Sequence, residues 1–444
     1  MSRVLETEIT MESGYTLAQA TAEAARCLLC HDAPCSGDCP ATTDPGKFIR
    51  QLRMRNIKGA IATVKRNNAL GGVCGALCPT CDMCQRACTA TGIGGPIDIG
   101  GLQRFLVEYG WETGFAPLAA GESNGVSVAV VGAGPAGLSC AADLAQAGFA
   151  VTIFDRLDEP GGVPAHVIPA QRLSGEFIRR EVQEILDLGV TFVGGREIAS
   201  QADLQAIRDE GFAAIYLGTG AWSPTRLAVE GRDAEGVWDG IGFLTRARAD
   251  HNGMLATVSG KTVAVIGGGD TAMDVALVAS RLGAKDVYLL YRRSFPQMPA
   301  NAEERQRLLN EGVHALILTQ PVGYRVEDGR VVGIRAARTQ LNHRAVRGRR
   351  RAEAIEGSEH DIPADLVIEA IGLRPEDGIR KLGAVRIDEG DRIQVDTATG
   401  RTAADRVYAG GDAVRGAARI AEAVGDGKRA AAAIADALGE EGVR

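Results

Sequence analysis

Aromatic residues, histidines and long apolar runs are all scarce in this sequence. Phe, Trp and Tyr together make up 5% of the 444 residues, which is too few for a surface that stacks nucleic-acid bases. The formal charge of −7 gives no general attraction to nucleic acid or to anionic lipid. We therefore expect neither nucleic acid nor a membrane surface as a partner.

Membrane-spanning and export signals are also lacking. No stretch approaches the ~20 apolar residues that cross a bilayer. The N-terminal MSRVLETEITMESGYTLAQA has neither the basic region nor the apolar core of a signal peptide. These absences lead us to expect a cytoplasmic protein without a membrane segment.

Side-chain constellations for hydrolytic or acid–base catalysis do not stand out. The six histidines are scattered, and no Ser/His/Asp set or pair of carboxylates is recognisable. This pattern is typical of proteins whose chemistry belongs to bound cofactors. We therefore predict no catalytic side chain.

Cysteines, in contrast, are clustered, because nine of the ten lie between Cys27 and Cys88. In a reducing compartment such clustering indicates metal rather than disulfides. The two runs are Cys27-x2-Cys30-x4-Cys35-x3-Cys39-Pro40 and Cys74-x3-Cys78-Pro79-x-Cys81-x2-Cys84-x3-Cys88. A CxxC run that closes on Cys-Pro is typical of ferredoxins, in which cysteines of one segment are divided between two clusters. Two [4Fe–4S] clusters are predicted, with structural zinc as the alternative.

The pattern along the chain predicts an α/β protein with a helical N-terminal domain and two Rossmann-like units. Residues 1–120 read as short helices and loops around the cysteines, and a strand–glycine turn–helix pattern begins after them. The same pattern returns about 135 residues later, between two similar crossover strings, AAIYLGTGAWSP and ADLVIEAIGLRPED. We therefore predict a first nucleotide-binding domain split into 121–240 and 366–444, and a second domain, 241–365, inserted into it.

The first glycine motif, between a strand and a helix, indicates a dinucleotide site. Its residues are Gly132, Gly134, Pro135, Ala136 and Gly137. The first glycine permits a tight turn, the second lets the backbone approach a pyrophosphate, and the third lets the helix pack on the strand. Asp155 ends the next strand, where a carboxylate can hold a ribose hydroxyl.

The second motif contains Gly267, Gly268 and Gly269, and an alanine replaces the last glycine of the G-x-G-x-x-G pattern. Arg292 and Arg293 end the strand that follows the motif's helix. Arginines in place of the acid suit a 2′-phosphate, since a guanidinium supplies paired donors and positive charge. The alternative is that both arginines are merely solvated. The choice between NADH and NADPH stays open.

Together these features resemble the electron-input half of dihydropyrimidine dehydrogenase, which in bacteria is a separate NAD-dependent subunit. The resemblance rests on CLLCHDAPCSGDCPATTDPGKFI, CGALCPTCDMCQRACTATGIGGPIDIGGLQRF, both nucleotide motifs and the closing AGGDAV, and it covers essentially the whole chain. It implies FAD in the first nucleotide-binding domain, NAD(P)H in the second, and two [4Fe–4S] clusters. The small subunit of glutamate synthase is similar in layout.

The resemblance also implies individual site residues. It assigns the first cluster to Cys27, Cys30, Cys35 and Cys88, and the second to Cys39, Cys78, Cys84 and Gln103. The glutamate synthase pattern looks to carry an acid at the position of Gln103. The resemblance therefore implies that the glutamine favours the dihydropyrimidine dehydrogenase family. Cys81 departs from the family pattern, and whether Cys81 or Gln103 is the fourth ligand stays open. Cys74 resembles a family cysteine that is not a ligand.

Further residues are assigned to the two nucleotides. For FAD they are Gly161, Gly162, Arg172, Gly411 and Asp412. For the nicotinamide nucleotide they are Gly268, Asp270 and Thr271. Gly218, Thr219, Gly220 and Gly372, in the two crossover strings, are also predicted to bind a cofactor.

The resemblance implies hydride transfer from NAD(P)H to FAD and single-electron transfer through the clusters. The chain has no room for an FMN-binding barrel, so uracil or thymine would be reduced by a partner subunit that carries FMN and further clusters. We therefore expect a hetero-oligomer. The alternatives are the glutamate synthase small subunit or another NAD(P)H-dependent ferredoxin-type reductase and, from a different class, a redox-inactive assembly protein with zinc and a structural nucleotide.

Overall fold

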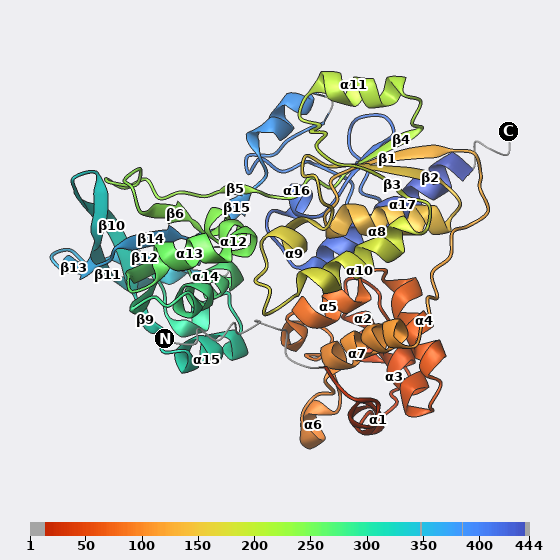
Figure 1. The fold of residues 1–444 in the computed structure, drawn as a ribbon, viewed down its shortest axis with the longest axis horizontal. Helices are drawn as coiled ribbons and strands as arrows, with labels where there is room; N and C mark the ends of the chain where they lie inside the picture. Colours follow the sequence, from red (N-terminus) through yellow and green to blue (C-terminus); the bar gives the residue numbers. More distant parts are fainter. Residues whose placement is uncertain (1–13, 347–348, 384, 440–444) are drawn as a thin grey trace, which may run out of the picture. The chain divides into compact units, whose positions relative to one another are not determined.

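The computed structural model describes residues 14–346, 349–383 and 385–439, and the chain divides into two compact units (Figure 1). The first unit consists of Met1–Ala165, Ala170–Ala221 and Arg374–Arg444. The second consists of His166–Pro169 and Trp222–Leu373. Within the described residues, no helix is both long and apolar enough to cross a membrane.

The N-terminal part of the first unit is helical. Its elements are α1 (Leu17–Ala25), α2 (Pro34–Gly37), α3 (Pro45–Arg53), α4 (Ile57–Asn67), α5 (Gly71–Leu77), the 3-10 turn η1 (Thr80–Asp82), α6 (Thr91–Gly94) and α7 (Ile99–Glu112). Polar side chains cap several of them, such as Thr16 on α1 and Asp98 on α7, because they accept from otherwise unpaired backbone N–H groups. The helices share one apolar core around Phe48 and Leu52, and several cysteines pack against its edge.

A parallel five-stranded sheet of order β16-β4-β1-β2-β3 forms the rest of the first unit. Its strands are β1 (Ser127–Val131), β2 (Ala150–Phe154), β3 (Thr191–Val193), β4 (Ala214–Leu217) and β16 (Val407–Ala409). The helices and turns of this region are α8 (Pro135–Gln146), α9 (Gly162–His166), α10 (Gly175–Leu186), α11 (Gln201–Asp209), η3 (Asp377–Leu382), α16 (Asp412–Arg415) and α17 (Ile420–Gly439). Helix α17 lies along α8 (Figure 1), and a Cβ added to Gly427 would come within 2.1 Å of the Ala136 carbonyl oxygen. The C-terminal helix thus returns to the first glycine turn.

The second unit repeats this design with a parallel sheet of order β6-β14-β7-β8-β9. Its strands are β6 (Val237–Asp239), β7 (Thr262–Ile266), β8 (Asp286–Tyr291), β9 (His314–Ile317) and β14 (Leu366–Glu369). Its helices and turns are α12 (Gly240–Ala249), α13 (His251–Val258), α14 (Asp270–Arg281), η2 (Phe295–Gln297) and α15 (Ala302–Asn310). An antiparallel sheet adds β10 (Thr319–Glu327), β11 (Arg330–Val346), β12 (Arg349–Ala354) and β13 (His360–Pro363).

The compact units differ from the predicted boundaries at two places. The second unit extends beyond the predicted 241–365, because β6 pairs in parallel with β14 and the short strands β5 (Ser223–Pro224) and β15 (Leu373–Arg374) also pair. The predicted helical domain, 1–120, is grouped in one unit with the segments predicted to bind FAD. The finer domain boundaries stay a prediction.

Candidate cofactor sites

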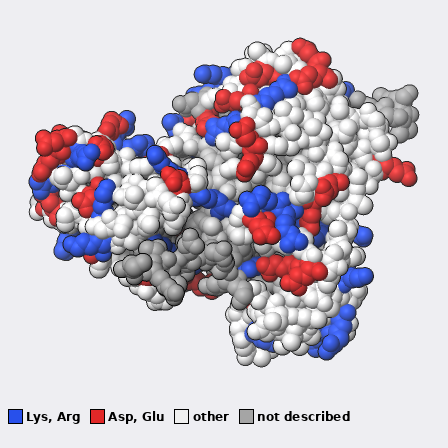
Figure 2. Space-filling view, in the orientation of Figure 1, with Lys and Arg blue, Asp and Glu red and all other residues white. Residues whose placement is uncertain are grey.

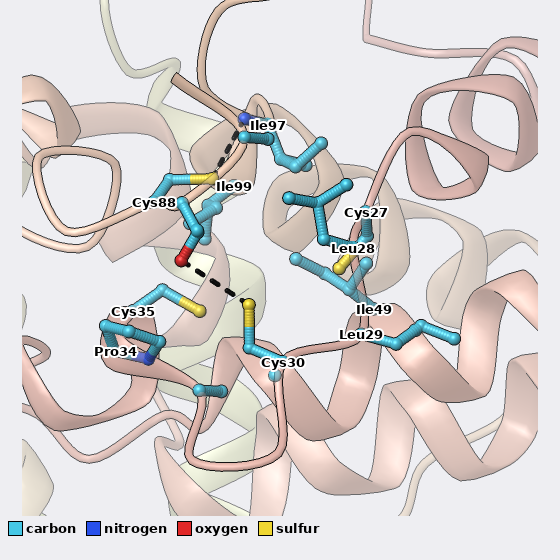
Figure 3. A pocket seen from close by; sticks show the side chains of 14 residues that line it. Cys27, Leu28, Leu29, Cys30, Pro34, Cys35, Ile49, Cys88, Ile97 and Ile99 are labelled. Carbon is cyan, nitrogen blue, oxygen red and sulfur yellow. Dashed lines mark hydrogen bonds between the residues drawn. The ribbon is translucent and has the colours of Figure 1, made fainter. Parts of the chain in front are cut away.

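A first pocket is lined by cysteines from both runs (Figure 3). It holds about 420 Å³ of space between atoms, open solvent included, and its wall includes Cys27, Cys30, Cys35 and Cys88. Leu29 has a φ of 55°, in the left-handed region that costs a leucine free energy. This turn lets the cysteines on either side of Leu29 line the same pocket. The structure thus brings together the four residues expected for the first cluster.

The loops around this pocket are tied down by arginines. Arg53 donates to the carbonyl oxygen of Cys27 at 2.5 Å, and Arg50 donates to that of Cys30 at 3.4 Å. Two contacts also reach cysteine sulfurs. The Cys30 thiol donates to the Thr89 hydroxyl at 3.4 Å, and the backbone N–H of Ile97 donates to Cys88 Sγ at 3.5 Å (Figure 3).

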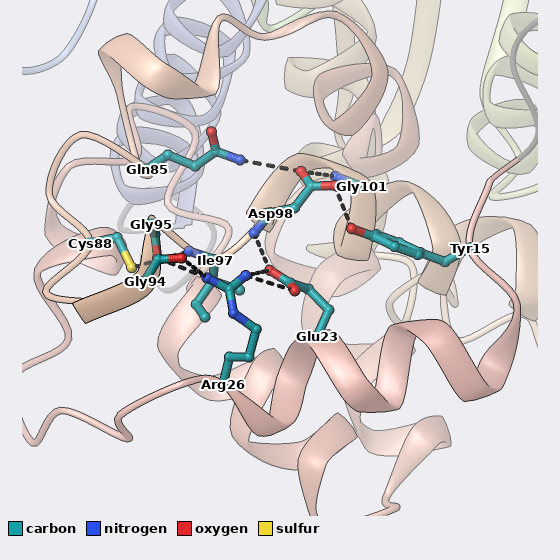
Figure 4. A network of polar contacts seen from close by, with 10 residues as sticks. All are labelled: Tyr15, Glu23, Arg26, Gln85, Cys88, Gly94, Gly95, Ile97, Asp98 and Gly101. Atoms are coloured by element: carbon teal, nitrogen blue, oxygen red, sulfur yellow. Dashed lines mark hydrogen bonds and ion pairs between the residues drawn. The ribbon is translucent and has the colours of Figure 1, made fainter. Parts of the chain in front are cut away.

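Asp98 is the centre of a polar network beside the same pocket (Figure 4). Its carboxylate accepts hydrogen bonds from Tyr15, Gln85 and the backbone of Gly101, and its N–H donates to Glu23. Glu23 in turn pairs with Arg26, which donates to the carbonyl oxygens of Gly94 and Gly95 at the end of α6. The network therefore joins α1, the segment that carries the second cysteine run, and the start of α7.

A second pocket, of about 340 Å³ with open solvent included, is lined by Cys39, Cys78, Cys84 and Gln103. Only 6% of Gln103 is exposed, and its amide nitrogen donates to the Gly71 carbonyl oxygen at the start of α5. The structure thus also brings together the four residues expected for the second cluster.

Two further cysteines lie near the second pocket and differ in placement. Cys74, on α5, is 4% exposed and lines the pocket. Cys81, in η1, is not among the described residues that line it. The choice between Gln103 and Cys81 as the fourth ligand stays a prediction.

The buried thiols are of the type that binds metal, but no positive charge among the described residues stabilises their ionised form, so their pKa values are raised. Burial, together with the neighbouring Cys88 and Cys27, raises the pKa of Cys35 to about 11. Burial, with a smaller contribution from Cys39, raises the pKa of Cys84 to about 12. Among the described residues, none of the ten cysteines forms a disulfide, and no three His, Cys, Asp or Glu side chains converge closely enough for a single metal ion. The cysteines surround pockets rather than a point, which fits a cluster, and cluster binding would release their protons.

A buried charge network connects the second pocket to α10. Lys65 is 2% exposed and lies 2.7 Å from carboxylate oxygens of both Glu181 and Glu184. Glu181 also accepts from the N–H groups of Gly72 and Val73 in the first turn of α5. The positive end of α5 and Lys65 together compensate the buried Glu181 carboxylate, although desolvation still raises its pKa.

The first glycine turn joins β1 to α8, as predicted for a dinucleotide site. Gly132 has a φ of 102°, and a Cβ there would come within 2.4 Å of the Gly218 carbonyl oxygen. Pro135 and Ala136 are the first two residues of α8. Asp155 follows β2, and its carboxylate accepts from the N–H of Ala133 at 2.6 Å. The turn and the strand-end acid are therefore adjacent.

A second glycine turn packs on the first. Gly161 donates its N–H to the Ala133 carbonyl oxygen at 2.8 Å, and a Cβ added to Gly162 would lie 2.6 Å from Gly134 Cα. Only glycine allows this approach, so the two turns form a backbone cradle of the kind that binds a pyrophosphate. Thr219 Oγ1 lies buried with no hydrogen-bond partner among the described residues, which fits a polar ligand group.

The remaining residues expected at FAD lie in three places. Arg172 precedes α10, and Gly220 follows β4 with a φ of 75°. Gly411 has a φ of 67° and donates its N–H to Asp426. Asp412 begins α16, and burial raises its pKa to about 7.

The second glycine turn, Gly267–Gly269, joins β7 to α14 and has the same design. Gly267 has a φ of 148°, and a Cβ on Gly268 would lie 2.5 Å from the Tyr291 ring. A Cβ on Gly269 would meet no atom within 4 Å, so this position borders open space. Asp270 and Thr271 begin α14, and Gly372 accepts from the Thr225 N–H in the returning crossover.

Arg292 and Arg293 follow β8, at the same place as Asp155 follows β2. The side chain of Arg293 donates to the carbonyl oxygen of Arg350 on β12 at 2.8 Å. Arg292 is exposed, and its own carbonyl accepts from Thr339. On the face drawn in Figure 2, basic and acidic side chains are interspersed.

Several residues that shape the sites were missed by sequence reasoning. Glu181 and Lys65 are far apart in the chain, and no local pattern pairs them. Asp98 carries a usable signal, since an Asp three residues before Gly101 is typical of a helix N-cap. Thr89 carries none beyond its place next to Cys88.

Comparison with known proteins places both parts of the chain. Residues 126–427 match the family described as pyridine nucleotide-disulphide oxidoreductase, and residues 5–115 match the dihydropyrimidine dehydrogenase domain II, 4Fe-4S cluster. The glutamate synthase [NADPH] small chain of Escherichia coli is 34% identical over 90% of this chain and 87% of its own length. The NAD-dependent dihydropyrimidine dehydrogenase subunit PreT of Escherichia coli is 36% identical over 90% of each chain. Its counterpart in Salmonella typhimurium is 40% identical over 66% of this chain and 69% of its own.

Solved structures share the fold. FprA of Mycobacterium tuberculosis in complex with NADPH has a TM-score of 0.61 at 20% identity, over 72% of this chain and 86% of that one. Thioredoxin reductase of T. acidophilum has a TM-score of 0.55 at 23% identity, over 70% of this chain and 98% of that one.

These matches confirm the predicted fold class, the enzyme class and the cofactor types, which are FAD, [4Fe–4S] and a nicotinamide nucleotide. They leave the redox-inactive alternative without support. The chain is an electron-input oxidoreductase subunit, and it belongs to the pyridine nucleotide-disulphide oxidoreductase family, with an N-terminal 4Fe-4S domain of the dihydropyrimidine dehydrogenase type.

Proposed function

We propose that this chain is the electron-input subunit of a dihydropyrimidine dehydrogenase. Its partner would carry FMN and further clusters and reduce uracil or thymine reversibly to the dihydropyrimidine. The observation that carries this proposal is Gln103, a buried glutamine that lines a pocket with Cys39, Cys74, Cys78 and Cys84. The resemblance implies an acid at this position in the glutamate synthase pattern, so an amide oxygen as ligand would distinguish the two families.

We assign two [4Fe–4S] clusters to the two pockets. Cys27, Cys30, Cys35 and Cys88 would hold the first, and Cys39, Cys78, Cys84 and Gln103 the second. Cys81 lies outside this set, and the buried Cys74 would be a neighbour of the second cluster rather than a ligand. When bound, FAD accepts a hydride from NAD(P)H and the clusters carry its two electrons singly.

The chain's own residues would hold these groups in place. The turns at Gly132 and Gly161 would hold the FAD pyrophosphate, and Asp155 would hold a ribose hydroxyl. Asp412 would accept from the ribityl chain, and Thr219 would supply a hydroxyl to the flavin side of the site. In the second unit, the turn at Gly267 and the N-terminus of α14 would hold the coenzyme pyrophosphate.

The partner would dock where the first pocket reaches the surface. Leu28, which lines this pocket, is 46% exposed, and Ile93, on α6, is 78% exposed. Leu28 lies in the segment before α2 and Ile93 lies in α6, and these segments are joined by Arg26 and by the contact between Cys30 and Thr89. A hetero-oligomer in the cytoplasm is the assembly that this proposal requires.

Reconstitution with candidate partners tests the function. The chain, purified anaerobically with its cofactors, should oxidise NAD(P)H with an artificial acceptor and should not reduce uracil alone. With an FMN- and iron–sulfur-containing pyrimidine-reducing subunit, NAD(P)H oxidation should become uracil-dependent. Oxidation that instead depends on glutamine and 2-oxoglutarate, with a glutamate-forming partner, would favour the second candidate, the glutamate synthase small chain. That candidate is supported by 34% identity over 90% of this chain.

Iron analysis tests the ligand assignment separately. We expect about eight iron atoms per chain. Cys81→Ser should keep all of them, whereas Gln103→Ala should lose or alter the second cluster. The reverse result would assign Cys81 as the ligand and remove the main support for the proposal that the chain serves a dihydropyrimidine dehydrogenase.

A further inference from the structure

Thr89 is the side-chain hydroxyl that the structure places against a sulfur of the first pocket. The Cys30 thiol donates to Thr89 Oγ1 at 3.4 Å. Thr89 is exposed and Cys30 is half-buried, so the contact lies near the mouth of the pocket. Neither side chain belongs to the apolar core of the helical part.

The direction of this hydrogen bond must reverse when a cluster is bound. A cysteine that ligates iron is a thiolate and has no proton to donate. The contact between Cys30 and Thr89 is then attractive only if the Thr89 hydroxyl donates to the sulfur. A hydrogen bond to a ligand sulfur stabilises the reduced cluster, which carries one more negative charge, and so raises its reduction potential.

The backbone on both sides of the contact is held in place. Arg50 and Arg53 bind the carbonyl oxygens of the loop that carries Cys30. Arg26 binds the two carbonyl oxygens that follow Ile93. The separation between the loops is therefore set by three guanidinium groups rather than by the weak sulfur contact itself.

The second pocket has a different side chain beside one of its candidate ligands. There the buried Cys74 thiol lines the pocket together with the candidate ligand Cys78. A thiol is a weaker donor than a hydroxyl. The two candidate clusters thus differ in the side-chain donor that faces one of their ligands.

We propose that Thr89 is a positioning residue of the first cluster, whose hydroxyl raises the reduction potential of that cluster and favours electron transfer to it from the second cluster. This inference rests on the proposed assignment of the first cluster. It predicts that electrons leave the chain on the Thr89 side, where Leu28 and Ile93 are exposed.

The test compares Thr89→Val, which keeps the shape and removes the donor, with Thr89→Ser, which keeps the donor. Anaerobic redox titrations of the holo-protein, followed by electron paramagnetic resonance, give both midpoint potentials. Cys30→Ser identifies the signal of the first cluster. We expect Thr89→Val to shift the ratio of reduced to oxidised first cluster by threefold to tenfold, which is about 30–60 mV toward lower potential for one electron.

Thr89→Ser should remain near the wild type, and the potential of the second cluster should not move in either variant. The exchangeable deuteron that pulsed resonance detects near the first cluster in D₂O should be lost in Thr89→Val. Unchanged potentials with full iron content would overturn the inference while leaving the proposed function intact. Loss of the first cluster in both Thr89→Val and Thr89→Ala would also overturn it, because Thr89 would then hold the cluster rather than set its potential. A wild-type protein without [4Fe–4S] signals would contradict the cluster assignment itself.

Discussion

The two nucleotide-binding turns share one backbone design but have opposite charges at their strand ends. Gly132 and Gly267 begin the turns, with φ values of 102° and 148°. After the next strand, the first unit has Asp155 and the second has Arg292 and Arg293. The glycines thus determine where a pyrophosphate can approach, and the strand-end side chain determines which ribose substituent is recognised.

The turns also differ in tightness. A Cβ on Gly137 would lie 1.9 Å from the carbonyl oxygen of Gly132, a distance that no repacking of side chains can relieve. The corresponding position in the second unit is Ala272, which is fully buried and accommodated. The first turn therefore requires glycine at a position where the second tolerates a methyl group.

The largest expected effect comes from Gly137→Ala. The clash with the Gly132 backbone should destabilise the first unit by about 3 kcal/mol or more and abolish FAD binding. The measurements are flavin content per chain and denaturant unfolding followed by flavin fluorescence. The matched control is Ala272→Gly, which should cost only about 1 kcal/mol as a glycine in a helix. Normal flavin content in Gly137→Ala would show that the first turn is looser than the structure indicates.

This contrast shows which features the sequence could predict. The alternation of strand, glycine turn and helix has a local signature, so both Rossmann-like units and the helical cysteine domain could be predicted. The difference in tightness at Gly137 and Ala272 depends on the distance between a helix and a turn. In the sequence, the only sign of this difference is that position 137 is a glycine and position 272 is an alanine.

The cysteine region shows where prediction stops. The two cysteine sets could be proposed from spacing and family resemblance, and the structure places them around two pockets. The Lys65–Glu181 pair could not be proposed, because 116 residues separate its members and each lies in an ordinary amphipathic helix. Such long-range pairing is decided by packing rather than by local pattern.

The next largest effect is expected for Asp155→Ala. The carboxylate accepts from the N–H groups of Ala133 and Leu157, at 2.6 and 2.8 Å, so its removal leaves two backbone donors without their acceptor. We expect the free energy of FAD binding to be weaker by about 1–3 kcal/mol. This loss corresponds to roughly a tenfold to hundredfold weaker FAD affinity. Flavin titration of the FAD-free protein measures this. Arg292→Ala should leave FAD affinity unchanged, and a loss there would show that the two turns are not independent.

A pH dependence should follow from Asp412 in the same unit. Burial raises the pKa of its carboxyl to about 7, although the Ala418 N–H donates to it at 3.2 Å and opposes this shift. If the ionised Asp412 carboxylate accepts a hydrogen bond from FAD, its pKa is lower in the FAD-bound protein than in the FAD-free protein. FAD affinity should therefore fall as the pH drops below about 7. The slope can reach about tenfold per pH unit. Titrations of Asp412→Asn between pH 6 and 8 should show no such slope, and an equal slope in both proteins would assign it to another group.

The smallest expected effect concerns the arginines at the end of β8. Arg293 is tied to the carbonyl oxygen of Arg350, whereas Arg292 is exposed, so Arg292 is the residue available to a 2′-phosphate. An exposed arginine–phosphate contact contributes about 1 kcal/mol. Arg292→Ala should therefore lower the ratio of kcat/KM for NADPH to that for NADH by roughly threefold to tenfold.

Arg293→Ala should lower the ratio less, and the double variant should resemble Arg292→Ala. Arg281→Ala, at the far end of α14, is the control and should leave the ratio unchanged. An unchanged ratio in the double variant would mean that opposite charges at the two strand ends do not determine coenzyme choice, and that the 2′ position is recognised by other residues or not at all.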